Sequence, residues 1–332
     1  MINRRTLLAA AVLPMAACAR GPERTELSIA VGGQSLLVYL PLTLARQLGY
    51  FDEAGVRVRI DDFQGGSKAL QALQGGSADM VCGYYDHTIQ MQAKGRDITS
   101  FVTMLRYPSL VLAVSPATNR TVRSLHDLAG ANIGVTAPGS SSDFFLRYLL
   151  TANGIATTAV SIQGVGGGAG AIAAMSTGRV DAAVLVEPAI SVLRKRSGAT
   201  GVEILADTRT SAGVERFLGV PNYPAAVLYS NLSWIDGNHD AVRRVAKAIT
   251  LALQWISSHT AAEIAERMPP EYAGGDREAY IEAIAAMIDS FSPDGVMPEN
   301  GAAAVRAVLA ASDPQIAQAA IDLGRTYTNR YL

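Results

Sequence analysis

The chain has 332 residues, of which 49% are hydrophobic and 17% are charged, and its formal net charge is −1. This near-neutral balance, without a basic face, argues against nucleic acid as a partner. The length exceeds what one hydrophobic core usually organises, so two domains are expected.

The first 17 residues carry the features of an export signal. Arg4 and Arg5 precede the twelve uncharged residues Thr6–Ala17, a positive start followed by a short apolar stretch. A membrane span needs about 20 apolar residues, so this stretch is too short to be one. We predict a signal peptide over residues 1–17. The arginine pair fits both the twin-arginine route and the general export route.

Cys18 directly follows this signal. Residues 15–18 read Met-Ala-Ala-Cys and resemble a bacterial lipobox, in which the cysteine receives lipid. The alternative is a plain secretory signal in which Cys18 is incidental. With Cys18 lipidated, Cys82 has no disulfide partner, and its place in an apolar run favours a small buried side chain. Residues 18–26 then form a lipid-anchored linker.

Strand and helix patterns alternate over residues 26–114. Short apolar runs indicate strands, and glycine or proline at their boundaries marks where helices start and stop. The expected strands cover residues 27–31, 56–60, 79–82 and 98–104, and the expected helices cover residues 41–48, 67–74 and 86–93. This alternation predicts a mostly parallel sheet covered by helices.

The same plan returns between residues 124 and 205. Seven residue pairs match at a constant separation of 102 residues, from Gly65 and Gly167 to Asp79 and Asp181. A glycine pair, a small apolar helix, another glycine and an aspartate that opens a strand therefore occur twice. We interpret this repeat as one βαβ crossover used in each of two facing lobes.

The remaining residues, 233–332, have a helical pattern, and we expect them to dock on the first lobe. The domain boundaries that follow are residues 27–112 and 228–332 for the first lobe and residues 113–227 for the second. The chain then crosses between the lobes twice, near residues 110–115 and 224–229. Two crossings make a hinge.

Ligands of such lobes bind beyond the carboxyl ends of the strands, where helices begin. The loops that meet this description are residues 32–35, 65–67, 138–142 and 164–168. Ser140, Ser141 and Ser142 start a helix, where they hold an anion with the free N–H groups or merely cap the helix. The glycine runs contact a ligand or merely turn the chain. No Lys-Ser or Lys-Thr follows the fourth loop, so nucleotide binding is not supported.

Tyr84, Tyr85 and Glu187 also stand at strand ends. Adjacent residues of a strand point to opposite faces, so one tyrosine should line the cleft and the other the core. A buried Glu187 needs a partner, so it accepts from a ligand, bridges the lobes or serves a helix start. The sequence has no clustered Cys/His set and no G-x-S-x-G motif. We therefore predict no metal site, no cofactor and no catalytic residue.

Several stretches together resemble the nitrate/sulfonate/taurine (SsuA-like) substrate-binding proteins of ABC importers. They span nearly all of the chain after the signal and include Leu40-Pro41-Leu42, Leu48-Gly49-Tyr50-Phe51, Ile133-Gly134-Val135, Pro138-Gly139-Ser140-Ser141 and Glu187-Pro188. The resemblance implies an α/β fold of the periplasmic-binding-protein type, type II, whose two lobes close about a two-crossing hinge. It also implies capture and delivery of a small solute, not enzymatic activity.

The resemblance also implies which residues contact the ligand and which partners the protein has. The expected ligand-binding residues are Gln34, Ser35, Gly66, Ser67, Tyr84, Tyr85, Ser140, Ser141, Ser142, Gly166, Gly167 and Glu187. The expected partners are a small solute, an ABC permease with its ATPase, and the membrane through the lipid on Cys18. We expect a monomer in the periplasm or cell envelope.

The ligand class stays open. Members of the family bind sulfonates, nitrate, pyrimidine precursors of thiamine or aromatic acids. An oxyanion needs a cation in the cleft, for which the candidates are Lys68, Arg106 and Arg147. Tyr107 and Tyr223 are able to stack a ring, and Glu187 suits a nitrogen-bearing ligand. We expect a small organic solute with a polar or anionic head, sulfonates first. The alternatives are a thiamine-pyrimidine-synthase-like enzyme of the same fold and a ligand-sensing partner of a receptor.

Overall fold

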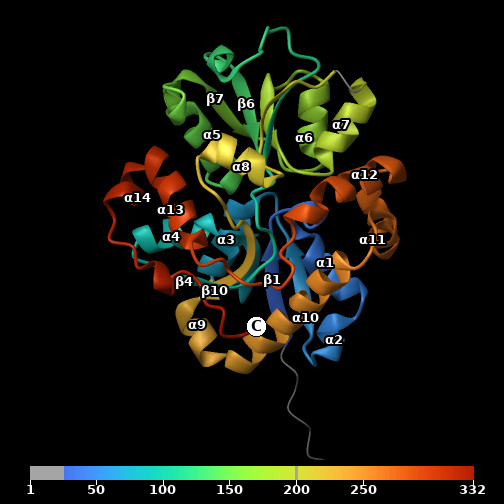
Figure 1. Ribbon diagram of the computed structural model, residues 1–332, viewed down its shortest axis with the longest axis vertical. Helices are drawn as coiled ribbons and strands as arrows, with labels where there is room; N and C mark the ends of the chain where they lie inside the picture. The colour runs from blue at the N-terminus through green and yellow to red at the C-terminus, as the bar shows by residue number, and fades with distance from the viewer. Residues whose placement is uncertain (1–25, 199–200) are drawn as a thin grey trace, which may run out of the picture.

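The computed structural model describes residues 26–198 and 201–332, so the predicted signal peptide and Cys18 lie outside the described residues. Figure 1 shows two lobes, one above the other, with C-terminal helices on either side of their junction. Within the described ranges, no helix is long and apolar enough to cross a membrane.

The first lobe, the lower one in Figure 1, contains a five-stranded sheet with the order β2-β1-β3-β10-β4. Its strands are β1 (Leu27–Val31), β2 (Val58–Asp62), β3 (Met80–Tyr84), β4 (Ile98–Thr103) and β10 (Ala226–Asn231). β1 is parallel to β2 and β3, whereas β10 is antiparallel to β3 and β4. All residues of β1 and β3 are buried, as expected for strands covered on both faces.

The second lobe repeats this sheet with the order β7-β6-β8-β5-β9. Its strands are β5 (Val111–Val114), β6 (Asn132–Val135), β7 (Ser161–Gly164), β8 (Ala182–Leu185) and β9 (Ile204–Asp207). The parallel and antiparallel pairs match those of the first lobe. In both sheets the chain arrives from the other lobe to form the fourth strand, β5 or β10. The lobe boundaries that we predicted after residues 112 and 227 therefore fall inside these two strands.

Asp79 and Asp181, the last of the repeated pairs, do the same work in the two sheets. Oδ2 of Asp79 accepts the backbone N–H of Ser28 at 2.7 Å, and Oδ2 of Asp181 accepts that of Asn132 at 2.9 Å. The backbone N–H of each aspartate donates back to the carbonyl oxygen of the same partner. The Asp79 carboxylate thus holds β3 in register with β1, and the Asp181 carboxylate holds β8 in register with β6.

Helices cover both sheets. Those of the first lobe are α1 (Leu40–Gln47), α2 (Tyr50–Glu53), α3 (Gly66–Gln74) and α4 (Asp86–Ala93). Those of the second lobe are α5 (Ser141–Ala152), α6 (Ala169–Ser176), α7 (Ala189–Ser197) and α8 (Ser211–Leu218). The C-terminal helices are α9 (Leu232–Gly237), α10 (His239–Ser257), α11 (Ala261–Arg267), α12 (Arg277–Met287), α13 (Gly301–Ser312) and α14 (Pro314–Gln318).

The C-terminal helices join the two lobes. α10 packs on α1, α2 and β4 of the first lobe, whereas α12 packs against α7 and α13 against α5 of the second. In Figure 1, α12 and α13 flank the junction from opposite sides. The expectation that this part of the chain only completes the first lobe was therefore too narrow.

Two local predictions were wrong. β2 starts two residues later than expected, because the N–H of Val56 still closes the turn after α2 by donating to Phe51 O at 2.9 Å. The chain after α14 is not a regular helix. There the N–H of Ser100 donates to Thr326 O at 3.0 Å, and the N–H of Thr328 donates to Ser100 O at 2.8 Å. This segment covers the edge strand β4, whose free backbone groups need partners.

Candidate functional site between the two lobes

The loops that follow the strands of both lobes meet in one cleft. A first cavity there is lined by Gly32, Leu36, Val38, Tyr39, Gly66, Tyr84, Leu110, Thr136, Ser140, Ser141, Ser142 and Val186. A second cavity lies beside α13 and is lined by Tyr84, Asp86, Pro108, Leu110, Ser141, Phe144, Phe145, Tyr148, Leu218, Tyr223, Val308, Leu309 and Ser312. Tyr84, Leu110 and Ser141 line both cavities, and we refer to the two together as the inter-lobe cleft.

The lobes are closed onto each other across this cleft. The cavities have volumes of about 20 Å³ and 10 Å³, which is room for about one water molecule each. The N–H of Leu37 donates to the carbonyl oxygen of Glu187 in the other lobe at 3.0 Å. Gly167 admits the Leu36 side chain, because a Cβ there would stand 2.6 Å from Leu36 Cδ1. A solute larger than water therefore enters only when the lobes move apart.

Asp86 is the acidic residue that lines the inter-lobe cleft. It begins α4 and is 1% exposed. Its Oδ1 accepts from Oγ of Ser141 at 2.8 Å, which joins the two lobes through a hydrogen bond. Burial raises the pKa of Asp86 to about 7, against the lowering effect of the Ser141 hydroxyl. The sequence did not single out Asp86, because nothing local shows that the other lobe buries this side chain.

Aromatic rings surround this carboxylate. Tyr39, which the sequence did not suggest, meets the ring of Tyr84 edge-on with 6.3 Å between centroids. The neighbouring His87 meets Phe144 of the other lobe edge-on at 6.1 Å, and its Nδ1 is 3.1 Å from the Tyr229 hydroxyl. Burial lowers the pKa of His87 to about 4, so the imidazole is neutral at physiological pH.

The two adjacent tyrosines point to different sides, with Tyr84 at the end of β3 and Tyr85 directly before α4. Tyr84 lines both cavities, and its hydroxyl donates to Pro108 O at 2.7 Å. Tyr85 points the other way, where its hydroxyl is hydrogen-bonded to Thr326. Only Tyr84 therefore has access to the cleft.

The three serines at the start of α5 line the cleft but do not cap the helix. Ser140 occupies the N-cap position without a side-chain cap hydrogen bond, and its Oγ donates to Ala137 O at 2.7 Å. Ser140 and Ser142 bond to each other and to Thr136 in a cluster of hydroxyl groups, with oxygen–oxygen distances of 2.7–2.9 Å. Ser141 alone reaches across to the first lobe.

Two carboxylates face the start of α5. Asp143 Oδ2 accepts the N–H of Gly139 at 2.8 Å, and Asp86 accepts from Ser141. The positive end of the helix dipole is thus already balanced by negative groups. One of the two, Asp86, lines the cleft beside the serines that suggested an anion site.

Glu187 is buried but does not line either cavity. Its Oε1 is 2.6 Å from Nη1 of Arg209, and its Oε2 accepts the N–H of Ser191 at 3.1 Å. Burial raises the pKa of Glu187, and the Arg209 guanidinium partly offsets the rise. Of the roles that we considered for Glu187, the backbone carbonyl bridges the lobes and the carboxylate serves the start of α7.

Other predicted contacts lie at the rim or outside the cleft. Gln34 turns its Nε2 toward Thr43 at 3.5 Å, and Ser35 faces Gly168. Ser67 lies opposite Gly139 in a surface groove, and Gly166 has an open surrounding. These four rim positions differ from Gly66 and the serines, which line the first cavity.

None of the three candidate cations lines either cavity. Lys68 is exposed beside Gln71, Arg147 pairs with Asp143 at 2.8 Å, and Arg106 donates to the carbonyl of Asp289. Of the two tyrosines proposed to stack a ring, Tyr223 lines the second cavity and Tyr107 lines neither.

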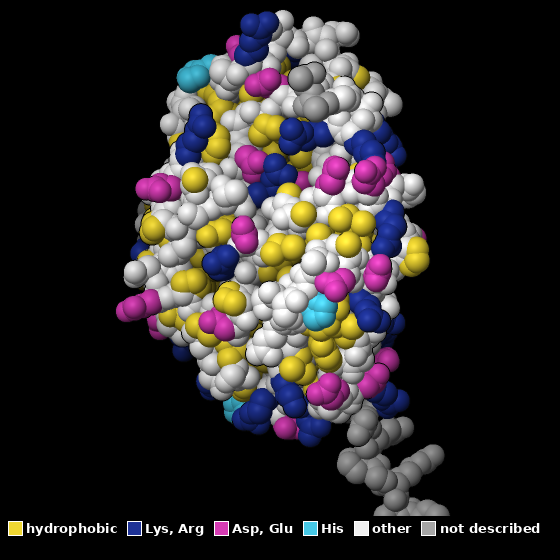
Figure 2. Space-filling model, turned by 45° about the vertical axis from the view of Figure 1, so that its right-hand side comes forward, with side chains coloured by type: hydrophobic (Ala, Val, Ile, Leu, Met, Phe, Trp, Pro, Cys, Tyr) yellow, Lys and Arg dark blue, Asp and Glu magenta, His cyan; other side chains and the backbone are white. Residues whose placement is uncertain are grey.

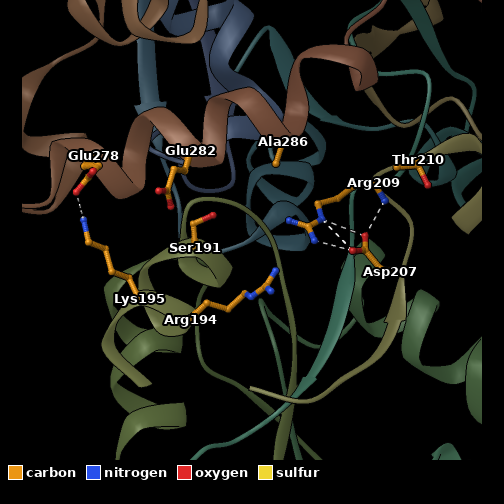
Figure 3. Close-up of a pocket in the computed structure, with 9 residues that line it drawn as sticks. All are labelled: Ser191, Arg194, Lys195, Asp207, Arg209, Thr210, Glu278, Glu282 and Ala286. Atoms are coloured by element: carbon orange, nitrogen blue, oxygen red, sulfur yellow. Dashed lines mark hydrogen bonds and ion pairs between the residues drawn. The ribbon is translucent and has the colours of Figure 1, made fainter. Parts of the chain in front are cut away.

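An open groove of about 690 Å³ runs along one side of the lobe junction. Figure 3 shows side chains from α7 and from the chain after β9 facing α12 across this groove. Lys195 of α7 reaches Asp276 at 2.9 Å and Glu278 at 2.8 Å, so these ion pairs join the lobes. Figure 2 shows basic and acidic side chains interspersed over the molecular face drawn there.

The described residues contain no cluster of three or more His, Cys, Asp or Glu side chains arranged to hold a metal ion. Cys82 is buried in β3 as a free thiol, and burial raises its pKa.

Comparison with known proteins places the chain in a family. Residues 38–262 match the family described as NMT1/THI5 like. The chain belongs to this family. A solved structure from Bordetella bronchiseptica RB50 is 40% identical to it, covers 92% of this chain and 95% of its own length, and superposes with a TM-score of 0.88.

Two more distant structures confirm the periplasmic-binding-protein fold. The alkanesulfonate-binding protein SsuA of Xanthomonas axonopodis, solved with MOPS, is 18% identical over 91% of this chain and 98% of its own, with a TM-score of 0.70. The nitrate-binding protein NrtA of Synechocystis is 14% identical over 93% of this chain and 87% of its own, with a TM-score of 0.64. The family resemblance read from the sequence is confirmed.

Proposed function

We propose that this chain is the solute-binding component of an ABC importer, which captures a small organic solute between its lobes and delivers it to a membrane permease and its ATPase. One observation carries the proposal. Two equivalent lobes, joined by two crossing segments, close over cavities that both lobes line. Closure of two lobes about a hinge is a standard way to enclose a ligand. Solved neighbours of the same fold are an alkanesulfonate-binding protein and a periplasmic nitrate-binding protein, which supports a binding role.

The solute class rests on weaker support. The family resemblance and the alkanesulfonate-binding neighbour favour a sulfonate-type solute, which stays the first class to test. Of the contacts expected from the resemblance, Gly66, Tyr84 and the serines of α5 are the ones that line the cavities.

Export and anchoring belong to the same proposal. Cys18 is expected to carry the lipid that keeps the protein near its permease, because an acylated N-terminus binds the membrane stably when it has more than one chain. A Cys18→Ser variant should lose incorporation of labelled palmitate and appear in the soluble envelope fraction. Unchanged labelling in that variant would contradict lipidation at this position.

Binding is tested with the purified mature protein. A panel of sulfonates, nitrate, small carboxylates, amines and pyrimidines is screened by thermal shift, and native mass spectrometry checks for a solute retained from the cell. Binding to the folded state alone raises the free energy of unfolding by about 2.7 kcal/mol at 100 times the Kd. A solute that is consumed in a turnover assay would point to an enzyme and overturn the proposal.

A further inference from the structure

Asp86 lacks the partner that a buried carboxylate normally has. Transfer of an isolated carboxylate out of water is expensive, so buried acids are usually paired with a cation. The hydroxyl of Ser141 is a neutral partner. No lysine or arginine in the described part of the chain forms an ion pair with Asp86. Hydrogen bonds and the start of α5 face this group, but no cation compensates its charge when the lobes close.

The charged part of the cleft lining is acidic. Among the described residues, no lysine, arginine or histidine lines either cavity, and Asp86 is the sole acidic residue that does. The start of α5, where an anion would otherwise bind, already faces Asp86 and Asp143. A sulfonate or nitrate in this cleft would meet a carboxylate without a compensating cation.

The rings beside Asp86 suit a positive group. Tyr84 and Tyr223 line the cavity that contains Asp86, and Phe144 closes it from the second lobe. Tyr39 lines the adjoining cavity next to Tyr84. A cation over an aromatic face is attracted by about 0.5–2 kcal/mol, and more strongly away from water.

We infer that Asp86 is the ligand-recognition group of the cleft and that the solute presents a protonated or N–H-bearing nitrogen to it, with the tyrosines around the same nitrogen. This inference rests on the proposed function and names the solute class of that site. The ligand nitrogen takes the position that Ser141 Oγ holds beside Asp86 Oδ1 in the closed lobes. Ser141 is then free to turn its hydroxyl toward the solute.

The ionisation of Asp86 links recognition to pH. Its pKa of about 7 means that the carboxylate gains its charge across the neutral range. The groups that face it stay neutral there: burial raises the pKa values of Tyr39, Tyr84, Tyr223 and Tyr229 and lowers that of His87 to about 4. A permanently charged cation should therefore bind more tightly as the pH rises through 7.

The test uses matched solutes and matched variants. The nitrogen probes are n-butylamine, benzamidine, 4-aminopyridine and benzyltrimethylammonium, and the anionic probes are butanesulfonate, benzenesulfonate, benzoate and nitrate. Kd values are measured by calorimetry for the wild type, for Asp86→Asn and for a control, Asp143→Asn. Asp143 is a buried carboxylate in the first turn of α5, the helix start that Asp86 faces, but it turns to Gly139 and Arg147.

Binding of a nitrogen probe that weakens about 10- to 100-fold in Asp86→Asn, and less than about 3-fold in Asp143→Asn, supports the inference. Binding of an anionic probe that is unchanged or tighter in Asp86→Asn overturns the inference but leaves the proposed function standing. No binding from either class, and no retained solute, overturns the proposed function itself.

A second measurement covers the case in which Asp86→Asn does not fold. The Kd of benzyltrimethylammonium, which is charged at every pH, is measured with the wild type from about pH 5.5 to about pH 8.5, on either side of the Asp86 pKa. Affinity should rise about 10-fold or more across this range. A flat or falling profile overturns the inference.

Discussion

The central strands of the two sheets, β3 and β8, are each followed two residues later by a carboxylate. The two carboxylates have opposite surroundings. Glu187, after β8, is fully buried against Arg209 at 2.6 Å. Asp86, after β3, is buried against a hydroxyl of the other lobe at 2.8 Å. One repeated position thus carries a compensated acid in the second lobe and an uncompensated acid in the first. The difference indicates that Glu187 holds its own lobe together, whereas Asp86 remains available to something that enters the cleft.

The largest effect is expected from removing the cation of the compensated pair. Arg209→Met should lower the free energy of unfolding by about 3–5 kcal/mol, because Glu187 is left buried and unpaired. Denaturant unfolding of the purified variant measures the loss. Arg244→Met, which removes an exposed cation paired with Asp240, is the control and should cost less than about 1 kcal/mol. Equal losses in the two variants would show that Glu187 is not held by Arg209.

Substitution of Asp86, the acid without a paired cation, should change the free energy of unfolding in the opposite direction. The folded-state pKa of Asp86 is raised to about 7, so the folded protein keeps a proton that the unfolded chain releases near pH 4. Its contribution to the free energy of unfolding is therefore most favourable below pH 4 and declines as the pH rises through 7. Asp86→Asn removes this decline and should stabilise the unliganded protein by roughly 1–3 kcal/mol at pH 8.

His87 opposes this pH dependence in the wild type. Its folded-state pKa is lowered to about 4, so its contribution is lost as the pH falls from about 6.5 toward 4. The free energy of unfolding of Asp86→Asn should therefore decrease as the pH falls over that range, whereas that of the wild type should stay nearly constant. Thermal melts at several pH values test both signs, and a variant with the wild-type profile would contradict the assignment.

The repeated aspartates offer a comparison in which the lobes should agree. Asp79→Asn weakens a carboxylate hydrogen bond to β1 at 2.7 Å, and Asp181→Asn weakens the equivalent bond to β6 at 2.9 Å. Each should cost about 1–2 kcal/mol of unfolding free energy, because hydrogen bonds to charged groups are worth about that much. Chemical denaturation measures both variants, and a large difference between them would mean that the repeat is not energetically equivalent.

The smallest effect concerns the ion pairs across the groove. Lys195→Ala removes the contacts with Asp276 and Glu278 that join α7 to α12. Because these side chains are exposed, solute affinity should fall only about 2- to 5-fold at low ionic strength, and the difference should vanish at about 1 M salt. Lys247→Ala, on α10 away from the junction, is the control. A loss that persists at high salt would mean that Lys195 acts by packing.

Sequence patterns predicted the elements that depend on short-range order. The helix over residues 86–93 is found as expected, and the 102-residue repeat corresponds to two sheets of one topology. The repeated glycines and aspartates carried this information because each serves a turn or a strand start in its own neighbourhood. The strand period predicted that only one of Tyr84 and Tyr85 lines the cleft, but β3 ends at Tyr84, and Tyr85 turns away as the residue that precedes α4.

The chemistry of the cleft was decided by contacts between distant parts of the chain. Arg209 lies 22 residues after Glu187 and 55 residues separate Asp86 from Ser141, so no local pattern reports these pairs. The final segment pairs with Ser100 more than two hundred residues earlier, which only the edge of a finished sheet explains. The sequence by itself determined two lobes and the loops that face each other. Only the tertiary structure decided which carboxylate is paired, because burial and charge compensation arise when the two lobes meet.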